Sequence, residues 1–178
     1  LAGPASPPQA AAPQAFVARF ADQVKAGGTV LDVAAGGGRH SAFFLDRGHP
    51  VTAVDRDVSG LAFLAGRQGF EIVAADLESR PWPFSGRTFA AVVVVNYLWR
   101  PLFPALLGAL APGGLLLYET FAAGNERFGR PANPAFLLRP GELLAWVGGL
   151  LDVLSFEEGE EYEPRPAQRQ RIAARRPA

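Results

Sequence analysis

Acidic residues at the ends of predicted strands are the side chains best placed for chemistry in this sequence. Residues 30–38 (VLDVAAGGG) read as a buried strand that runs into a glycine-rich turn, and residues 51–55 (VTAVD) read as a second buried strand. Asp55 stands 23 positions after Asp32. Glycine lets a backbone approach a ligand where a Cβ would clash, and an acid at a strand tip can accept two hydrogen bonds from a ribose diol. The spacing predicts a nucleoside-binding βαβ unit.

The elements that must position these acids alternate along the chain. Apolar runs and turn residues predict strands at 29–34, 50–55, 70–75, 89–97, 115–121, 151–157 and 168–174. Helices are expected at 13–25, from the glycine turn to 47, and at 58–66, 101–110 and 140–148. Alternation of this kind predicts a doubly wound α/β fold with a mostly parallel sheet and helices on both faces. The polar segment 168–176 is expected to expose one face near a sheet edge.

Composition narrows the class of protein. The chain has 178 residues, of which 49% are hydrophobic and 19% charged, so we expect a flexible tail at 1–14 and one globular domain at 15–178. The zero formal net charge gives no strong signal for nucleic acid. The absence of cysteine excludes disulfides and cysteine-ligated zinc, and no metal site is predicted. The longest apolar run, 89–95, is far shorter than the ~20 residues of a membrane span, so we expect a cytoplasmic protein.

Together the motifs resemble the class I S-adenosylmethionine-dependent methyltransferase family, and the small size is similar to the tellurite-resistance type. The features that carry the resemblance are Asp32-x-Ala34-x-Gly36-x-Gly38, Asp55, Ala75-Asp76-Leu77-Glu78, Asn96-Tyr97 and Leu110-x-Pro112-Gly113-Gly114. Ala34 replaces the first glycine of the family. The resemblance implies a Rossmann-like sheet of seven strands, with the last strand antiparallel, and S-adenosylmethionine as cofactor.

The resemblance also implies which residues bind that cofactor. They are Asp32, Ala34, Gly36, Gly38, Asp55, Arg56, Asp76, Leu77 and Asn96. The glycine loop would pass under the methionine part, with Asp32 meeting the amino group or only capping the loop. Asp55 would bind the ribose, Asp76 the adenine amino group, and Leu77 would pack on the ring or present its backbone amide to it. Arg56 could instead belong to the start of the next helix.

Asn96 and Tyr97 fall where the family places groups that face the transferred methyl group. The open alternatives are that Asn96 only satisfies loop backbone and that Tyr97 is a core or lid aromatic. Because a sulfonium is an excellent leaving group, positioning of the reactants can supply much of the catalysis. Tyr97, Tyr118, Glu119 and His40 are the candidates for a general base, although His40 could simply cap or pack.

The longest irregular stretch, 122–139, is expected to help form the pocket for the methyl acceptor. The N-terminal tail and the helix carrying Phe16 and Phe20 would cover that pocket. Arg100 could clamp an anionic substrate or be solvated. The chemistry expected is in-line methyl transfer to a small molecule, by a monomer or a homodimer.

Two other functions stay open. A nicotinamide-dependent oxidoreductase would carry G-x-G-x-x-G, but Ser41 stands at the last glycine position counted from Gly36. A non-catalytic nucleoside-binding protein of the same fold would keep Asp55 and Asp76 without any turnover.

Overall fold

Seven strands form one sheet in the computed structural model, which describes residues 10–178. The strands are β1 (Val30–Val33), β2 (Val51–Asp55), β3 (Phe70–Ala74), β4 (Phe89–Val95), β5 (Leu110–Phe121), β6 (Asp152–Glu161) and β7 (Ala167–Arg175). The α-helices are α1 (Ala15–Phe20), α2 (Arg39–Asp46), α3 (Phe103–Gly108) and α4 (Glu142–Val147). Short 3-10 helices are η1 (Ala21–Gln23), η2 (Ser59–Leu64), η3 (Arg100–Leu102), η4 (Asn125–Arg127) and η5 (Pro134–Phe136).

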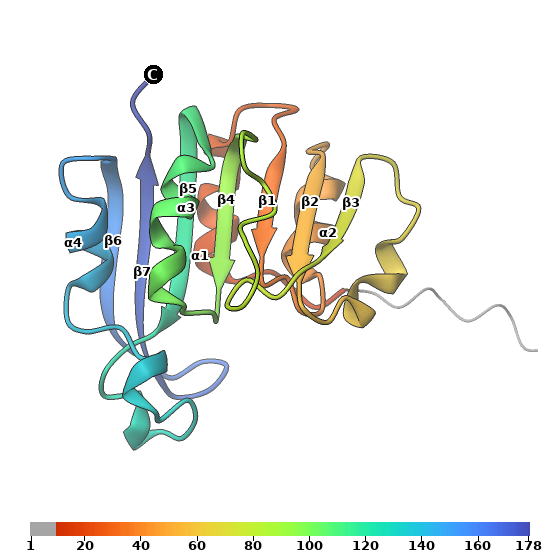
Figure 1. The fold of residues 1–178 in the computed structure, drawn as a ribbon. Coiled ribbons are helices and arrows are strands. Elements are labelled where there is room, and N and C mark those ends of the chain that lie inside the picture. Colours follow the sequence, from red (N-terminus) through yellow and green to blue (C-terminus); the bar gives the residue numbers. More distant parts are fainter. Residues whose placement is uncertain (1–9) are drawn as a thin grey trace, which may run out of the picture.

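The sheet has the order β3-β2-β1-β4-β5-β7-β6 (Figure 1). Strands β1 to β5 are parallel to one another, and β7 is antiparallel to both β5 and β6. This confirms the predicted seven-stranded, Rossmann-like sheet with an antiparallel last strand. The order reverses between β1 and β4, so the carboxyl ends of these strands open a crevice of the kind that binds ligands in such sheets.

Helices cover both faces of the sheet because alternate side chains of each strand point to opposite faces. On one face, α1 and α2 pack on apolar residues of the central strands, with Phe16, Val17 and Phe44 buried. On the other face, α3 and α4 pack through Phe103 and Val147. The central strands are buried on both faces, which explains their continuous apolar runs.

The structure differs from the sequence prediction at the C-terminal side of the sheet. β7 lies between β5 and β6 and is largely buried, so the prediction of one exposed face was wrong. Its polar residues are accommodated by specific partners: Gln170, for example, accepts a hydrogen bond from the backbone N–H of Leu143 at 2.8 Å. β5 begins at Leu110, five residues before the predicted start at 115, and its pairing with β4 is irregular near this early part of the strand.

The predicted flexible tail, residues 1–14, falls mostly on residues 1–9, which lie outside the described residues. Among the described residues of this tail, Gln14 makes two hydrogen bonds. Its backbone N–H donates to His40 Nε2 at 3.1 Å, and its side chain donates to Glu119 Oε1 at 3.0 Å. Phe16 and Phe20 are buried in the core, and Phe16 and Gln14 also line cavities beside it. Among residues 10–178, no helix is long and apolar enough to cross a membrane.

Candidate active site

The glycine loop after β1 has the backbone geometry that favours small residues. Gly36 and Gly38 have φ of +53° and +74°, and Ala34 also has a positive φ, +53°. An L-residue is strained in this left-handed region, which is why glycine is favoured at Ala34. A Cβ on Gly60 of η2 would lie 2.6 Å from the carbonyl oxygen of Gly36. The backbone of η2 therefore packs so closely against the glycine loop that only a glycine fits at position 60.

The acids that end β2 and follow β3 are both fixed by backbone and hydroxyl donors. Asp55 Oδ2 accepts from the N–H of Gly36 at 2.9 Å, and Oδ1 accepts from the N–H of Asp57 at 3.0 Å. Asp76 accepts from the N–H of Glu78 at 3.0 Å and from the Ser79 hydroxyl at 2.8 Å. The Ser79 hydroxyl and the Glu78 amide lower the pKa of Asp76, so it is ionised at neutral pH.

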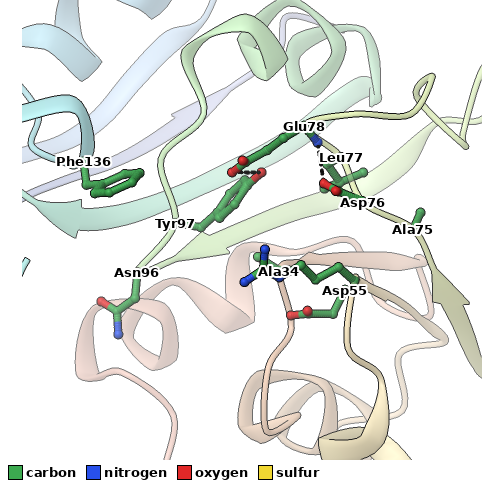
Figure 2. Close-up of a pocket in the computed structure, with 10 residues that line it drawn as sticks. Ala34, Asp55, Ala75, Asp76, Leu77, Glu78, Asn96, Tyr97 and Phe136 are labelled. Carbon is green, nitrogen blue, oxygen red and sulfur yellow. Dashed lines mark hydrogen bonds between the residues drawn. The ribbon is translucent and has the colours of Figure 1, made fainter.

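These acids line one cavity of about 410 Å³ at the carboxyl edge of the sheet. Its walls come from the loops after β1, β2, β3 and β4 and from η5 (Figure 2). The lining residues are Ala34, Asp55, Arg56, Ala75, Asp76, Leu77, Glu78, Asn96, Tyr97 and Phe136. An adjoining cavity of about 340 Å³ is lined by Asp32, Gly36 and Gly37, and it shares Ala34 and Asn96 with the first.

Most of the predicted cofactor residues are therefore brought together, with one exception. Gly38 lines neither cavity. It is buried at the start of α2, where a Cβ would lie 2.9 Å from a side-chain carbon of Leu61. Its packing against η2 gives a structural reason for a glycine there.

Asp32 and His40 are buried titratable groups beside the glycine loop. Asp32 is 3% exposed, and burial raises its pKa to about 6 even though the Ser41 hydroxyl donates to its Oδ2 at 2.6 Å. Burial and the nearby Arg39 lower the pKa of His40 to about 4. His40 is therefore neutral at pH 7, and its Nε2 already accepts from the backbone N–H of Gln14. This favours the capping alternative for His40 over a general base.

Asn96 and Tyr97 follow β4 and face the cavity. Asn96 has a φ of +57°, and its side-chain oxygen accepts from Arg169 Nη2 at 2.5 Å. Tyr97 donates its hydroxyl to Glu78 Oε1 at 3.4 Å (Figure 2). Burial and the negative charge of Glu78 raise the pKa of Tyr97, so it stays a neutral donor at physiological pH.

The other candidate bases have structural partners. The Tyr118 hydroxyl is buried and donates to the carbonyl of Tyr97 at 2.8 Å. Glu119 is buried and pairs with Arg169 at 3.0 Å. Arg100 is neither a substrate clamp nor solvated, because it forms a two-point ion pair with Glu142 at 2.7 and 3.0 Å.

Sequence reasoning missed several residues that shape this site. Phe136 is 50% exposed and closes one wall of the cavity, while Arg169 orients the Asn96 amide from β7. Arg169 lies in the segment that was predicted to be partly exposed, and nothing in its local pattern indicates a partner 73 positions away. Glu78 belongs to the motif Ala75-Asp76-Leu77-Glu78 after β3, which the sequence already indicated, although no role was predicted for it.

Comparison with known proteins supports the resemblance. The methyltransferase-domain profile matches residues 30–114. Among solved structures, 1,6-didemethyltoxoflavin-N1-methyltransferase from Burkholderia thailandensis, with bound 1,6-didemethyltoxoflavin and S-adenosylhomocysteine, superposes with a TM-score of 0.69 at 21% identity, covering 93% of this chain and 78% of that one. TehB from Haemophilus influenzae gives 0.71 at 18%, covering 90% of this chain and 61% of that one.

The glycopeptide N-methyltransferase MtfA, complexed with S-adenosylhomocysteine, has a TM-score of 0.65 at 22% identity, covering 94% of this chain and 91% of that one. No significant match was found among curated protein sequences. At these identities the structural likeness establishes the fold, and the profile match covers every residue that lines the cavity of about 410 Å³ except Phe136. The resemblance stated from the sequence is thereby confirmed: residues 30–114 match the methyltransferase-domain family, and the sheet has the fold of the solved S-adenosylmethionine-dependent methyltransferases.

Proposed function

We propose that this chain transfers the methyl group of S-adenosylmethionine to a small-molecule acceptor, with Asn96 and Tyr97 at the reacting centre. The observation that carries the proposal is the cavity of about 410 Å³, where acids from two strand ends meet these two residues. A volume of this size lies within the ~300–1,000 Å³ typical of small-molecule sites.

The donor and acceptor groups of the cavity fit this cofactor. Each oxygen of Asp55 accepts one backbone N–H, and because a carboxylate oxygen has two lone pairs, both retain capacity for a ribose hydroxyl. Asp76 has the same spare capacity for an adenine amino group, and Leu77 offers an apolar surface for the ring. Arg56 lines the same cavity.

The adjoining cavity suits the methionine part. Gly36 and Gly37 present backbone without side chains, and Asp32 lies behind them as an acceptor for an ammonium group. With a pKa of about 6, Asp32 is ionised at neutral pH, and a bound cation would favour its ionised form further.

When bound, S-adenosylmethionine supplies a sulfonium-linked methyl group, which a lone pair of the acceptor takes in line while the S–CH₃ bonding electrons return to sulfur. The residues of this chain orient the two reactants. Asn96 is held by Arg169, which leaves its amide N–H groups as donors toward the acceptor. Tyr97 contributes an aromatic wall and a neutral hydroxyl. The acceptor proton leaves to water, since positioning is the main requirement.

Other features support a small-molecule acceptor. A cavity of about 280 Å³ is lined by Tyr97, Phe121, Pro131 and Phe136, so segment 122–139 borders the same space as the proposed catalytic residue Tyr97. The methyltransferase from Burkholderia thailandensis was solved with a small molecule bound. The cytoplasmic location and the oligomeric state stay predictions.

The experiment is calorimetric titration with S-adenosylmethionine and S-adenosylhomocysteine, with NAD as a control ligand. We expect both sulfur ligands to bind wild type and Asp46→Asn, an exposed acid at the end of α2, and to bind Asp55→Asn at least about tenfold more weakly, because hydrogen bonds to charged groups are the strong ones. Preferential binding of NAD, or equal affinity in Asp55→Asn, would contradict the proposal. A screen of methyl acceptors then separates an enzyme from a silent binding protein.

A further inference from the structure

A second large cavity, of about 720 Å³, lies between segment 122–139 and the loop that joins β6 to β7. Figure 1 shows both segments below the carboxyl end of β5, outside the sheet. Asn96 lines this cavity and also the cofactor cavity, so a molecule in the larger space reaches the residue proposed to sit beside the methyl group.

The charged groups of this cavity are unbalanced. It is lined by four arginines and one glutamate: Arg39, Arg130, Arg165, Arg169 and Glu161. Glu161 is neutralised by an ion pair with Arg171, and Arg169 by its pair with Glu119. Within residues 10–178, Arg39, Arg130 and Arg165 form no ion pair. Three positive charges therefore face the cavity without a carboxylate partner.

We propose that the methyl acceptor is an organic anion whose acidic group is bound by Arg130 and Arg165, an assignment that rests on the proposed methyltransferase function. Guanidinium groups bind carboxylates and phosphates through paired N–H donors. Arg39, at the first turn of α2, also lines the cavity proposed for the methionine part of the cofactor. It therefore adds positive potential where that cavity meets the larger one. The shared chemistry of the ligand is a carboxylate or phosphate group.

The remaining walls indicate the body of the acceptor. Phe121 and Phe128 line the cavity with prolines of the β6–β7 loop. The Arg169 guanidinium lies over the Phe121 ring, 4.4 Å from its centroid. The Phe128 and Tyr162 rings pack edge to face, with their centroids 6.4 Å apart. Such walls suit a flat apolar group. An aromatic acid would place its ring on these walls, its anion on the arginines and its nucleophilic atom toward Asn96.

Buried contacts fix the two segments that carry Arg130 and Arg165. Asn125 is 2% exposed, donates to the carbonyl of Pro131 at 3.0 Å and accepts from the backbone N–H of Gln168 at 3.1 Å. Arg127 adds an ion pair of 2.6 Å to Glu160. The two segments are thereby tied together through β7, on either side of the cavity.

The test is ligand-observed saturation-transfer NMR on protein saturated with S-adenosylhomocysteine. The probes are pairs of an acid and its neutral counterpart: benzoate and benzamide, indole-3-acetate and indole-3-acetamide, and phenyl phosphate and phenol, with inorganic phosphate as the bare anion. The variant is Arg130→Gln/Arg165→Gln. The matched control, Arg47→Gln/Arg67→Gln, removes two arginines that precede β2 and β3 at the opposite edge of the sheet.

We expect acids to bind and their neutral counterparts not to bind. The Arg130→Gln/Arg165→Gln variant should lose acid binding at least about tenfold, whereas its affinity for S-adenosylhomocysteine and all binding by the control variant should be unchanged. Equal binding of acids and amides, binding of no acid, or acid binding that survives in the variant would overturn the anionic-acceptor assignment and leave the methyltransferase proposal standing. Failure of wild type to bind S-adenosylhomocysteine would overturn both.

Discussion

Replacing Asp32 by Asn tests whether the buried carboxylate of Asp32, on β1 beside the glycine loop, destabilises the folded protein when it is ionised. Asp32 is 3% exposed, and burial raises its pKa from 3.8 to about 6. Between those pH values the folded protein binds more protons than the unfolded chain, so acidic conditions favour folding. The contribution is fully present below pH 3.8 and is lost as the pH rises through 6. Asparagine keeps an oxygen for the Ser41 hydroxyl but carries no charge.

The size of the effect follows from the shift in pKa. A difference of about two units corresponds to ~3 kcal/mol at pH 7.5, where both states are ionised, and to about 1.5 kcal/mol at pH 5. The stability of Asp32→Asn relative to wild type should therefore increase by about 1.5 kcal/mol between pH 5 and pH 7.5. His40, whose pKa burial lowers to about 4, titrates in both proteins and cancels in the comparison.

The assay is urea unfolding of both proteins at pH 5.0, 6.0 and 7.5, followed by tryptophan fluorescence. Asp46→Asn is the matched control, because Asp46 is an exposed acid on the same helix–loop unit, paired with Arg67 at 2.9 Å. A stability difference for Asp32→Asn that does not change with pH would refute the reasoning, as would an equal change in the control. The variant should also bind S-adenosylmethionine more weakly.

Three other substitutions test the loop and its surroundings. Ala34→Gly should raise the free energy of unfolding by up to ~1 kcal/mol because the φ of Ala34 is +53°. Ala35→Gly, at a residue without positive φ, should lower the free energy of unfolding. Urea unfolding of both variants measures the two changes. Gly60→Ala should weaken S-adenosylhomocysteine binding in calorimetry, since its Cβ would lie 2.6 Å from a glycine-loop carbonyl; unchanged affinity would contradict this. Arg100→Met should lower the free energy of unfolding, measured by urea unfolding, by ~2–3 kcal/mol, because Glu142 is only 9% exposed and would lose its ion pair. Adding Glu142→Gln should restore part of that loss in stability.

The sequence by itself determined the fold class and the residues at the strand ends. Strand and helix periodicities, the glycine loop and the acids Asp55 and Asp76 are local features, and parallel strands bring their carboxyl ends to one edge. Placement of Ala34, Asp55, Asp76, Leu77 and the residues after β4 around one cavity follows from that rule. These expectations depended on neighbours in sequence and on a topology with few alternatives.

Tertiary structure decided which distant residues complete the site. β7 is inserted between β5 and β6, which buries Arg169 against Glu119 and brings it to Asn96. The same insertion fastens segment 122–139, so that Arg130 and Arg165 face one cavity. Periodicity reports only whether a position is buried. Which partner meets a buried or loop residue depends on strand order and packing, and these are set by the whole chain at once.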